Sequence, residues 1–266
     1  MTIKKSYKNK VYFSLVVSLI VGNAFINLAV AKSDTQETKL PSKASMVSLE
    51  KTVLPTEPTR TLVDQSNPYS MIKGAAEITF KRFANEAQGI KTNPNLLKKI
   101  VREELMPYIN YKYSALKVIG KHLKKSKKED VVEFFPVFRE YLITSYAQVF
   151  TLYDNQEVQF EPEKSFKNKK IIAVNTRIIM QGRDNIDVAF KVRLNKKTKQ
   201  WQAFDMVAEG VSLLDSKQAE LGGIIRQKGL PYVTELLKKK SNRDIVFKNS
   251  GKKKAITTIE KTNKAE

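Results

Sequence analysis

Residues 172–194 read IAVNTRIIMQGRDNIDVAFKVRL, and this stretch decides the fold. In both halves apolar residues alternate with polar ones, which is the period of a β-strand that has one covered face. The middle of the stretch, from Gly182 to Asn185, has the composition of a tight turn. The stretch therefore predicts an antiparallel hairpin.

Two further strands are predicted on either side of this hairpin. Residues 201–208 follow a polar turn and are expected to place Phe204, Met206 and Ala208 on one side. A shorter strand over residues 157–161 is expected to complete a curved antiparallel sheet of about four strands.

The chain before the sheet has helical periodicity. A first helix is expected to begin at Asn67, an N-cap residue that is followed by Pro68 at the first helical position. A second helix is expected to open in the same way at Asn93 and to end at Pro107. A third covers residues 109–120 and ends on a glycine that is suited to a C-cap.

A longer helix precedes the strands. Ser126 and Glu129 have the spacing of a capping box, which predicts the start of a helix that reaches Tyr153. Apolar residues appear on most of its sides, so it should be buried on several faces. Pro136 should kink this helix or divide it.

The last helical region covers residues 212–239 and is expected to be interrupted at Gly222 and Gly223 and again at Gly229. Helices, then strands, then a closing helix predict an α+β domain in which helices cover one face of a curved antiparallel sheet. The layout is similar to cone-shaped, NTF2-like or cystatin-like folds that have a central cavity. Periodicity alone leaves open whether the centre is filled or hollow.

The N-terminus has the layout of a secretory signal peptide over residues 1–31. Four lysines precede an apolar run over residues 11–30, and Ala29-Val30-Ala31 offers the small residues that signal peptidase accepts. We expect cleavage after Ala31 and export to the periplasm. A retained membrane anchor is the alternative, because about 20 apolar residues can span a bilayer.

Composition predicts one folded domain between two flexible ends. Residues 32–66 are expected to form a flexible leader, residues 67–240 the domain, and residues 241–266 a basic disordered tail. The formal net charge of +21 favours anionic partners such as acidic lipid head groups. For the tail, simple solubility and attraction to a membrane or a partner both stay open. Nucleic acid is disfavoured as a partner because no binding motif accompanies the lysines.

The residues give little support for catalysis. The only histidine, His122, lies in a lysine-rich stretch, and the chain has no cysteine and no nucleotide, nucleophile or metal-ligand motif. Asp205 and Glu209, four apart on a strand, are expected on one face about 13 Å apart, which is too far for a glycosidase pair. We therefore expect no enzyme activity, metal or cofactor, and a structural or interface role for both carboxylates.

Four motifs stand in order along the chain. They are NPY at 67–69, VREELMPY at 101–108 with KY at 112–113, WQAFDMVAEGVS at 201–212, and RQKG at 226–229. Together they resemble the MlaC family, also called the toluene-tolerance family, of periplasmic phospholipid-binding proteins. The resemblance covers about residues 67–237 and leaves the two ends outside it.

The resemblance implies an apolar cavity that holds the acyl chains of a glycerophospholipid, with the head group at its mouth. It implies a monomeric carrier that maintains outer-membrane lipid asymmetry and is not an enzyme. Such a carrier shuttles lipid between an outer-membrane lipoprotein–porin complex and an inner-membrane ABC transporter with an MCE-domain protein, and retrograde transport is favoured over anterograde. The alternative is an exported α+β adaptor with a solid core that binds a protein and no lipid.

From the same resemblance, inward strand residues opposite helix residues are expected to form the cavity walls. The expected wall residues are Ile100, Val101, Tyr113, Leu116, Phe138, Leu142, Val174, Ile178, Val188, Phe190, Val192, Phe204 and Met206. Three basic residues, Arg177, Lys191 and Arg226, are expected at the mouth, where they would attract the head group.

Overall fold

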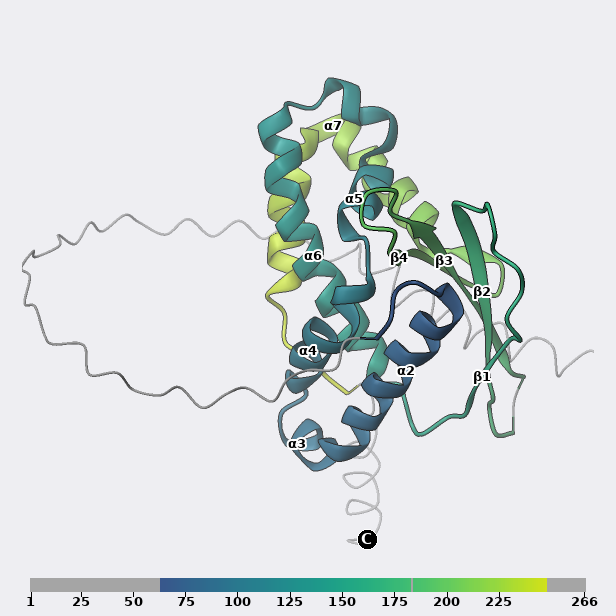
Figure 1. Ribbon diagram of the computed structural model, residues 1–266. Helices are drawn as coiled ribbons and strands as arrows, with labels where there is room; N and C mark the ends of the chain where they lie inside the picture. The colour runs from purple at the N-terminus through teal and green to yellow at the C-terminus, as the bar shows by residue number, and fades with distance from the viewer. Residues whose placement is uncertain (1–62, 183, 248–266) are drawn as a thin grey trace, which may run out of the picture. The chain divides into compact units, whose positions relative to one another are not determined.

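The computed structural model describes residues 63–182 and 184–247, which form an α+β fold around a five-stranded sheet (Figure 1). The α+β class is confirmed, with one more strand than predicted. All neighbouring strands are antiparallel and follow one another in space as they do along the chain. The strands are β1 (Val158–Phe160), β2 (Ile171–Ile178), β3 (Ile186–Leu194), β4 (Trp201–Ala208) and β5 (Val211–Ser212).

The predicted hairpin is confirmed, because Ile178 at the end of β2 pairs with Ile186 at the start of β3. The fifth strand has only two residues, too few for an alternating pattern to show in the sequence.

Most helices precede the sheet, and one long helix follows it. They are α2 (Pro68–Asn85), α3 (Ala87–Thr92), α4 (Leu96–Ile100), the π-helix η1 (Val101–Leu105), the 3-10 turns η2 (Met106–Tyr108) and η3 (Gly120–Lys125), α5 (Tyr111–Ile119), α6 (Lys128–Phe150) and α7 (Leu213–Ser241).

Side-chain caps start several of these helices. The Asn67 side chain accepts the N–H groups of Tyr69 and Ser70 at 2.9 and 3.2 Å, as predicted for the start of α2. At α5, the Asn110 side chain accepts the Tyr113 N–H at 3.1 Å. The Asn67 cap was predicted because it depends only on residues close in sequence, whereas the Asn110 cap was not predicted.

The predicted capping box at Ser126 is wrong. Helix α6 begins at Lys128 and has no side-chain cap, and the Ser126 hydroxyl donates instead to the His122 carbonyl at 3.1 Å. The hydroxyl thus closes the preceding turn η3 and does not serve the helix that follows.

The second predicted helix is shorter than expected and changes type. Asn93 accepts the Asn95 N–H at 3.1 Å and forms a turn, so α4 begins only at Leu96. The helix then widens into the π-turn η1 and tightens into η2, which contains Pro107 and ends at Tyr108.

The structure shows neither a division of the helix at Pro136 nor a break at Gly222 and Gly223. Pro136 lies inside α6, which runs undivided from Lys128 to Phe150. Helix α7 passes through Gly222 and Gly223 and breaks only at Gly229, where φ is 82° and ψ is 167°. This conformation favours glycine over residues that carry a Cβ.

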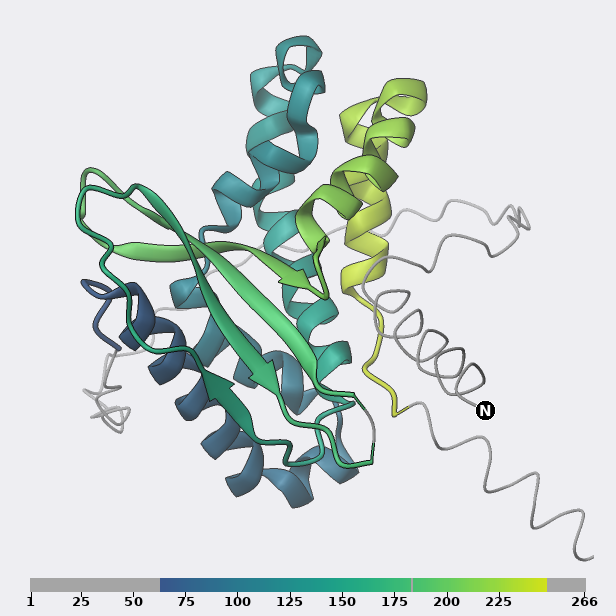
Figure 2. The same ribbon diagram turned by 90° about the vertical axis from the view of Figure 1, so that its right-hand side faces the viewer.

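Helix α2 packs on one face of the sheet. In Figure 2, which faces the sheet, α2 and α6 lie behind the strands. Met71 and Ile72 of α2 pack in one cluster with Val174, Val192 and Trp201 of the sheet, and all five are buried. The described residues belong to one compact unit.

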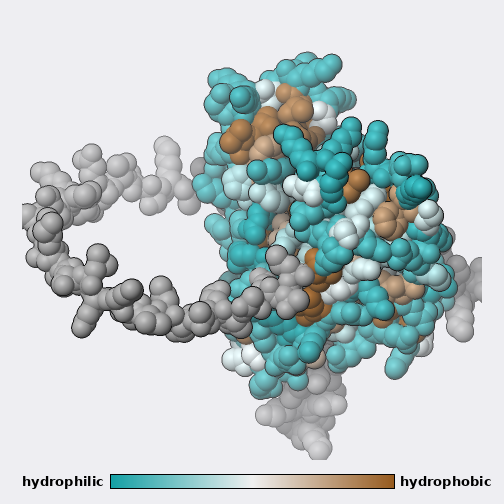
Figure 3. Space-filling model, viewed as in Figure 1, coloured by the Kyte–Doolittle hydropathy of each residue, from teal (hydrophilic) through white to brown (hydrophobic). Residues whose placement is uncertain are grey.

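Two further clusters join the helices to one another. Phe134 and Phe138 of α6 pack with Leu221 and Leu237 of α7 in a cluster that also includes α5. Residues of α2, α4 and α6 form the other cluster, which includes Ile143. We call the cluster of Phe134 and Phe138 the α5–α7 cluster, that of Ile143 the α4–α6 cluster, and that of Val174 and Trp201 the sheet cluster. Figure 3 shows a mostly hydrophilic surface with an apolar patch over the upper end of the α5–α7 bundle.

The fold begins before the predicted domain boundary at residue 67. The Val63 N–H donates to the Tyr108 hydroxyl at 3.0 Å, and the Gln65 carbonyl accepts the Trp201 N–H at 2.8 Å. Residues 63–66 therefore belong to the fold, although the sequence places them in the flexible leader.

The fold also extends past residue 240. Ile245 is only 3% exposed, packs in the α4–α6 cluster and donates its N–H to Asn95 at 3.0 Å. The predicted disordered tail is therefore wrong for residues 241–247. The predicted signal peptide, leader residues 32–62 and tail residues 248–266 lie outside the described residues.

A β-bulge interrupts β4 at Phe204, which has no partner in β3. The Phe204 ring packs edge-on against Tyr113 of α5, with ring centroids 5.1 Å apart. Met206 pairs with Phe190 and shares its face of the sheet, and Ala208 lies on the same face. The prediction that these three β4 residues share one side is therefore wrong for Phe204.

Candidate functional site

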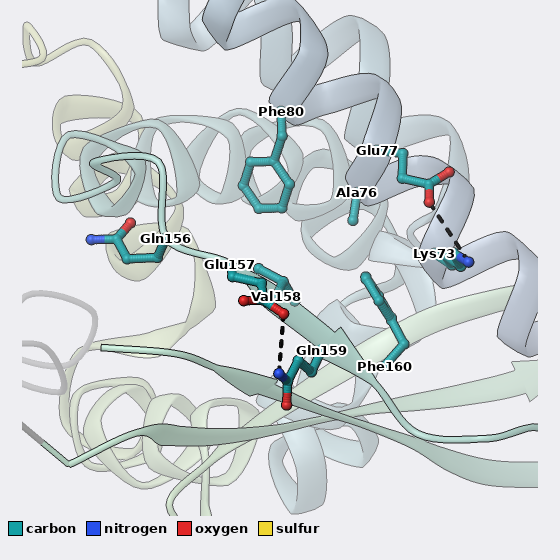
Figure 4. A pocket seen from close by; sticks show the side chains of 9 residues that line it. All are labelled: Lys73, Ala76, Glu77, Phe80, Gln156, Glu157, Val158, Gln159 and Phe160. Carbon is teal, nitrogen blue, oxygen red and sulfur yellow. Dashed lines mark hydrogen bonds and ion pairs between the residues drawn. The ribbon is translucent and has the colours of Figure 1, made fainter. Parts of the chain in front are cut away.

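A groove of about 730 Å³ lies between α2 and β1 (Figure 4). The α2–β1 groove is lined by Lys73, Ala76, Glu77 and Phe80 of α2 and by residues 156–160, which end in β1. Its volume falls within the range of about 300 to 1,000 Å³ that is usual for small-molecule sites.

The helical wall follows from the periodicity of α2. Lys73, Ala76, Glu77 and Phe80 are separated by three, one and three residues, so they lie on one face of the helix. In Figure 4 the Phe80 ring extends from α2 toward the strands. The neighbouring face of α2 carries Met71 and packs on the sheet, which holds the groove face at a fixed angle to β1.

An aromatic cluster supports Phe80 from below. Its ring stacks on Tyr153 with centroids 4.6 Å apart and meets Phe83 and Phe150 edge-on at 6.1 and 6.3 Å. Phe83 and Phe150 lie 4.8 Å apart. Burial raises the pKa of the Tyr153 hydroxyl above its ordinary value, so this phenol stays neutral at physiological pH.

The strand wall continues as an apolar surface across the sheet. Val158 of β1 pairs with Ile178 of β2, and Ile178 pairs with Ile186 of β3, so the three side chains share one face. All three are partly exposed, and none of them belongs to the three hydrophobic clusters of the described residues. Of the three, Val158 lines the groove, so an apolar ligand there would cover a side chain that the fold leaves partly open to water.

The outer face of the same strands is polar. Gln159, Arg177 and Asp187 are cross-strand partners there, and the Arg177 Nε lies 2.6 Å from the Asp187 carboxylate. This contact raises the pKa of Arg177 and lowers that of Asp187. The alternation thus separates an apolar groove face from a charged outer face.

Glu161 holds the end of β1 against β2. Its carboxylate accepts the backbone N–H and the side-chain amide of Asn175 at 2.8 and 3.0 Å and also pairs with Lys164. Burial raises the pKa of Glu161, but these hydrogen bonds outweigh it and leave the pKa below its ordinary value of 4.5. The carboxylate therefore stays charged at neutral pH and keeps the strand wall in place.

A partly buried charge cluster holds α2 on its other side. Arg82 lies 2.6 Å from Glu86 and 2.7 Å from Glu104, and it also pairs with Glu103. Burial lowers the pKa of Arg82, but the three carboxylates outweigh it and raise the pKa overall. The π-turn η1 carries two of these acids, so the cluster ties α2 to η1 within one helical turn of Phe80.

The rim of the groove is polar and lacks catalytic geometry. Lys73 and Glu77 face one another at 3.9 Å, and the Gln159 amide donates to Glu157 at 3.0 Å. Within residues 63–182 and 184–247, no group of acidic or histidine side chains is placed to hold a metal ion. In the same ranges, no helix has both the length and the hydropathy that crossing a bilayer requires.

The structure does not gather the predicted wall residues around one space. It distributes most of them among the packed clusters, and only Ile178 adjoins the α2–β1 groove through its partner Val158. Their role as ligand contacts stays a prediction. Tyr113, Leu116, Phe138 and Phe204 lie in the α5–α7 cluster, Ile100 and Val101 in the α4–α6 cluster, Leu142 in both, Val174, Phe190 and Val192 in the sheet cluster, and Ile178, Val188 and Met206 in none.

The three predicted mouth residues also lie apart. Arg177 is on the outer face of β2, and Lys191 forms an ion pair with Asp205 at 2.9 Å. Arg226 is exposed on α7. None of them lines the α2–β1 groove.

Asp205 and Glu209 have structural contacts, as their interpretation from the sequence predicts. The Asp205 carboxylate accepts the Ser212 hydroxyl at 2.7 Å and the Leu214 N–H at 3.0 Å, and thereby holds the start of α7. Glu209 accepts the Asp187 N–H at 2.6 Å. Glu209 lies in the turn after β4 with φ at 49°, so the expected spacing along one strand does not apply.

Sequence reasoning missed the groove residues Val158 and Phe160, and it assigned Phe80 only to a helical stripe. The groove joins a helix to a three-residue strand that lies about 80 residues further along the chain. No local periodicity carries that information, because the contact depends on the assembled fold.

Comparison with known proteins agrees with the fold and the motifs. The profile of the family described as MlaC protein matches residues 73–239. The intermembrane phospholipid transport system binding protein MlaC of Haemophilus influenzae is 33% identical over 190 residues, which cover 71% of this chain and 89% of that protein. The phospholipid-binding protein of Ralstonia solanacearum, solved in complex with a phospholipid, has a similar fold. Its TM-score is 0.58 at 15% identity, over 66% of this chain and 97% of that one.

Proposed function

The chain belongs to the MlaC protein family, and from this premise we propose that it is a periplasmic phospholipid carrier. It binds a glycerophospholipid, shields the acyl chains during transit and releases the lipid at a membrane complex. It acts as a carrier and not as an enzyme. The predicted signal peptide over residues 1–31 provides its export.

The observation that carries the proposal is the apolar face beside the α2–β1 groove. Val158, Ile178 and Ile186 share this face and remain partly exposed, with Phe80 opposite them on α2. Ala76, Phe80, Val158 and Phe160 give the groove apolar walls that suit an acyl chain. The polar rim formed by Lys73 and Glu77 suits the boundary between lipid tail and head group.

The energetics explain why a lipid needs such a carrier. Exposing two acyl chains of about 16 carbons to water costs on the order of 25 kcal/mol at about 0.8 kcal/mol per methylene. Spontaneous transfer across an aqueous compartment is correspondingly slow. A protein site that shields the tails from water removes most of this cost.

For the pathway, we propose the partners that the family resemblance implies. The carrier exchanges lipid with an outer-membrane lipoprotein–porin complex and with an inner-membrane ABC transporter that has an MCE-domain protein. Retrograde transport toward the inner membrane is the favoured direction. Loading the protein with labelled lipid and incubating it with each reconstituted complex tests both points, because a retrograde carrier should deliver label mainly to the inner-membrane complex.

The test of lipid binding is native mass spectrometry of the protein purified from the periplasm without detergent, followed by lipid extraction. We expect a stoichiometric phospholipid adduct. A clean apo mass with no uptake from liposomes would contradict the proposal and favour a protein-binding adaptor with a solid core.

Two matched variants on β2 test whether the groove holds the lipid. Ile178→Asp places a charge on the groove face, whereas Ile171→Asp places it on the outer face, where Ile171 is 49% exposed. We expect Ile178→Asp to lose most of the bound lipid and Ile171→Asp to keep it, with unchanged circular dichroism in both. Equal lipid content in the two variants would place the ligand elsewhere.

A further inference from the structure

One end of the molecule carries a dense group of exposed lysines. Residues 117–128 include six lysines and one histidine but no aspartate or glutamate. All six lysines are exposed, and among the described residues none of them forms an ion pair with an acid. We call this segment the basic tip; its lysines are Lys117, Lys121, Lys124, Lys125, Lys127 and Lys128.

Large apolar side chains lie among these charges. Leu123, in the middle of η3, is 38% exposed, and Val132, in the second turn of α6, is 57% exposed. Phe135 and Ile224 are partly buried against the α5–α7 cluster beneath them. Figure 3 shows apolar surface at this upper end of the molecule with hydrophilic side chains around it.

Helix α7 supports the tip and adds two more cations. The Gln218 side chain donates to the Lys117 carbonyl at 2.8 Å, and a Cβ at Gly222 would lie only 3.7 Å from the ring of His122. Beyond this contact, Arg226 and Lys228 are exposed just before the bend of α7 at Gly229. In both ribbon views, η3 and this bend lie at the same end of the molecule (Figures 1 and 2).

We propose that the basic tip docks on the surface of an anionic lipid bilayer. Clustered lysines attract an anionic leaflet, and exposed leucine and valine side chains can enter the boundary between head groups and acyl chains. Glu129 and Asp130 at the start of α6 offset only part of this charge. An acidic protein surface is the alternative partner, and the tests below distinguish it from a bilayer.

Docking at the tip leaves the α2–β1 groove free, because the groove lies between α2 and β1 and includes no tip residue. The tip would therefore tether the protein to a membrane surface without occupying the lipid site. This inference goes beyond the proposed carrier function, and lipid occupancy and membrane binding can be measured separately.

The test is flotation of the full-length exported protein with vesicles of phosphatidylcholine alone or mixed with phosphatidylglycerol. The variant Lys124→Gln/Lys125→Gln removes two tip charges, and Lys196→Gln/Lys197→Gln removes two exposed charges from the turn between β3 and β4 as the matched control. Since each lysine near an anionic surface contributes roughly fivefold to binding, the tip variant should bind about thirtyfold more weakly than the wild type. The control should stay close to the wild type.

A third variant separates membrane docking from attraction by charge alone. Leu123→Asn leaves the charge unchanged and should weaken binding to the anionic vesicles several-fold, whereas binding to an acidic protein resin should not change. The proposal is wrong if the control loses as much affinity as the tip variant, if vesicles without anionic lipid bind equally well, or if Leu123→Asn has no effect. Native mass spectrometry of each variant should show unchanged lipid content.

Discussion

Replacing Asp205 by alanine should lower the free energy of unfolding by about 3 kcal/mol, because its carboxylate serves three groups at the junction of β4 and α7. It accepts the Leu214 N–H at 3.0 Å and the Ser212 hydroxyl at 2.7 Å, and it pairs with Lys191 at 2.9 Å. The side chain of Asp205 is only 2% exposed, so water cannot replace it.

The magnitude follows from what each partner loses. The Leu214 N–H lies in a buried residue, and an unsatisfied buried donor costs about 1 to 3 kcal/mol. The Ser212 hydroxyl loses a partner worth about 1 kcal/mol, while the Lys191 side chain is 36% exposed, so its ammonium can be hydrated. Asp205→Asn keeps an oxygen for the Leu214 N–H and should cost about half as much.

Urea unfolding followed by circular dichroism measures the effect, and Asp187→Ala is the matched control. Asp187 also pairs across strands with a cation, Arg177, but both side chains are more than half exposed, so removing this pair should hardly move the urea midpoint. If Asp205→Ala and Asp187→Ala shift the midpoint equally, the argument from burial is refuted.

Three further predictions concern the core, the α7 bend and pH. Phe138→Ala should cost about 3 to 5 kcal/mol in urea unfolding, because the ring is 1% exposed in the α5–α7 cluster. Gly229→Ala should cost about 1 to 2 kcal/mol through its φ of 82°, whereas Gly223→Ala, with open space around it in a helix, should not destabilise the protein. Glu161, whose hydrogen bonds hold its pKa below 4.5, contributes stability above that pH and loses it as the pH falls through the native pKa. Glu161→Gln should therefore weaken the dependence of the urea midpoint on pH between about 5 and 3.

Signals that act between near neighbours could be predicted from the sequence. The cap at Asn67 and the glycine C-cap at Gly120, where φ is 53°, both depend on backbone groups within a few residues. The alternation in β2 and β3 likewise gave the correct hairpin. In each case the local residue pattern and the backbone conformation that it favours agree with the final fold.

Predictions failed where a residue had partners on either side or far away in the chain. The Ser126 hydroxyl could serve the turn before it or the helix after it, and only the assembled structure decides between them. Gly222 and Gly223 indicated a helix break, but α7 continues through both of them. Ile245 is buried by contacts with residues about 150 positions earlier, which no local composition can indicate.

The α2–β1 groove escaped prediction for the same reason, since it forms where β1 and α2 meet in three dimensions. The family resemblance implies an apolar site, and the periodicity of the strands and helices indicates which residues could form its walls. Periodicity identifies side chains that point inward, but it does not distinguish packed core from ligand surface. Ile178 points inward, yet it is partly exposed beside Val158, a difference from packed core that is visible only in the folded structure.

The bulge at Phe204 shifts by one residue the alternation of side chains along β4. Before the bulge, the odd-numbered residues Trp201 and Ala203 lie on the core face of the sheet. After it, the even-numbered residues Met206 and Ala208 lie on that face. Because the bulge adds one residue to β4, the consecutive residues Phe204 and Asp205 both contact helices, Phe204 at α5 and Asp205 at the start of α7. Deleting Phe204 would make the pairing of β4 with β3 continuous, but it would remove the ring that packs on Tyr113 of α5.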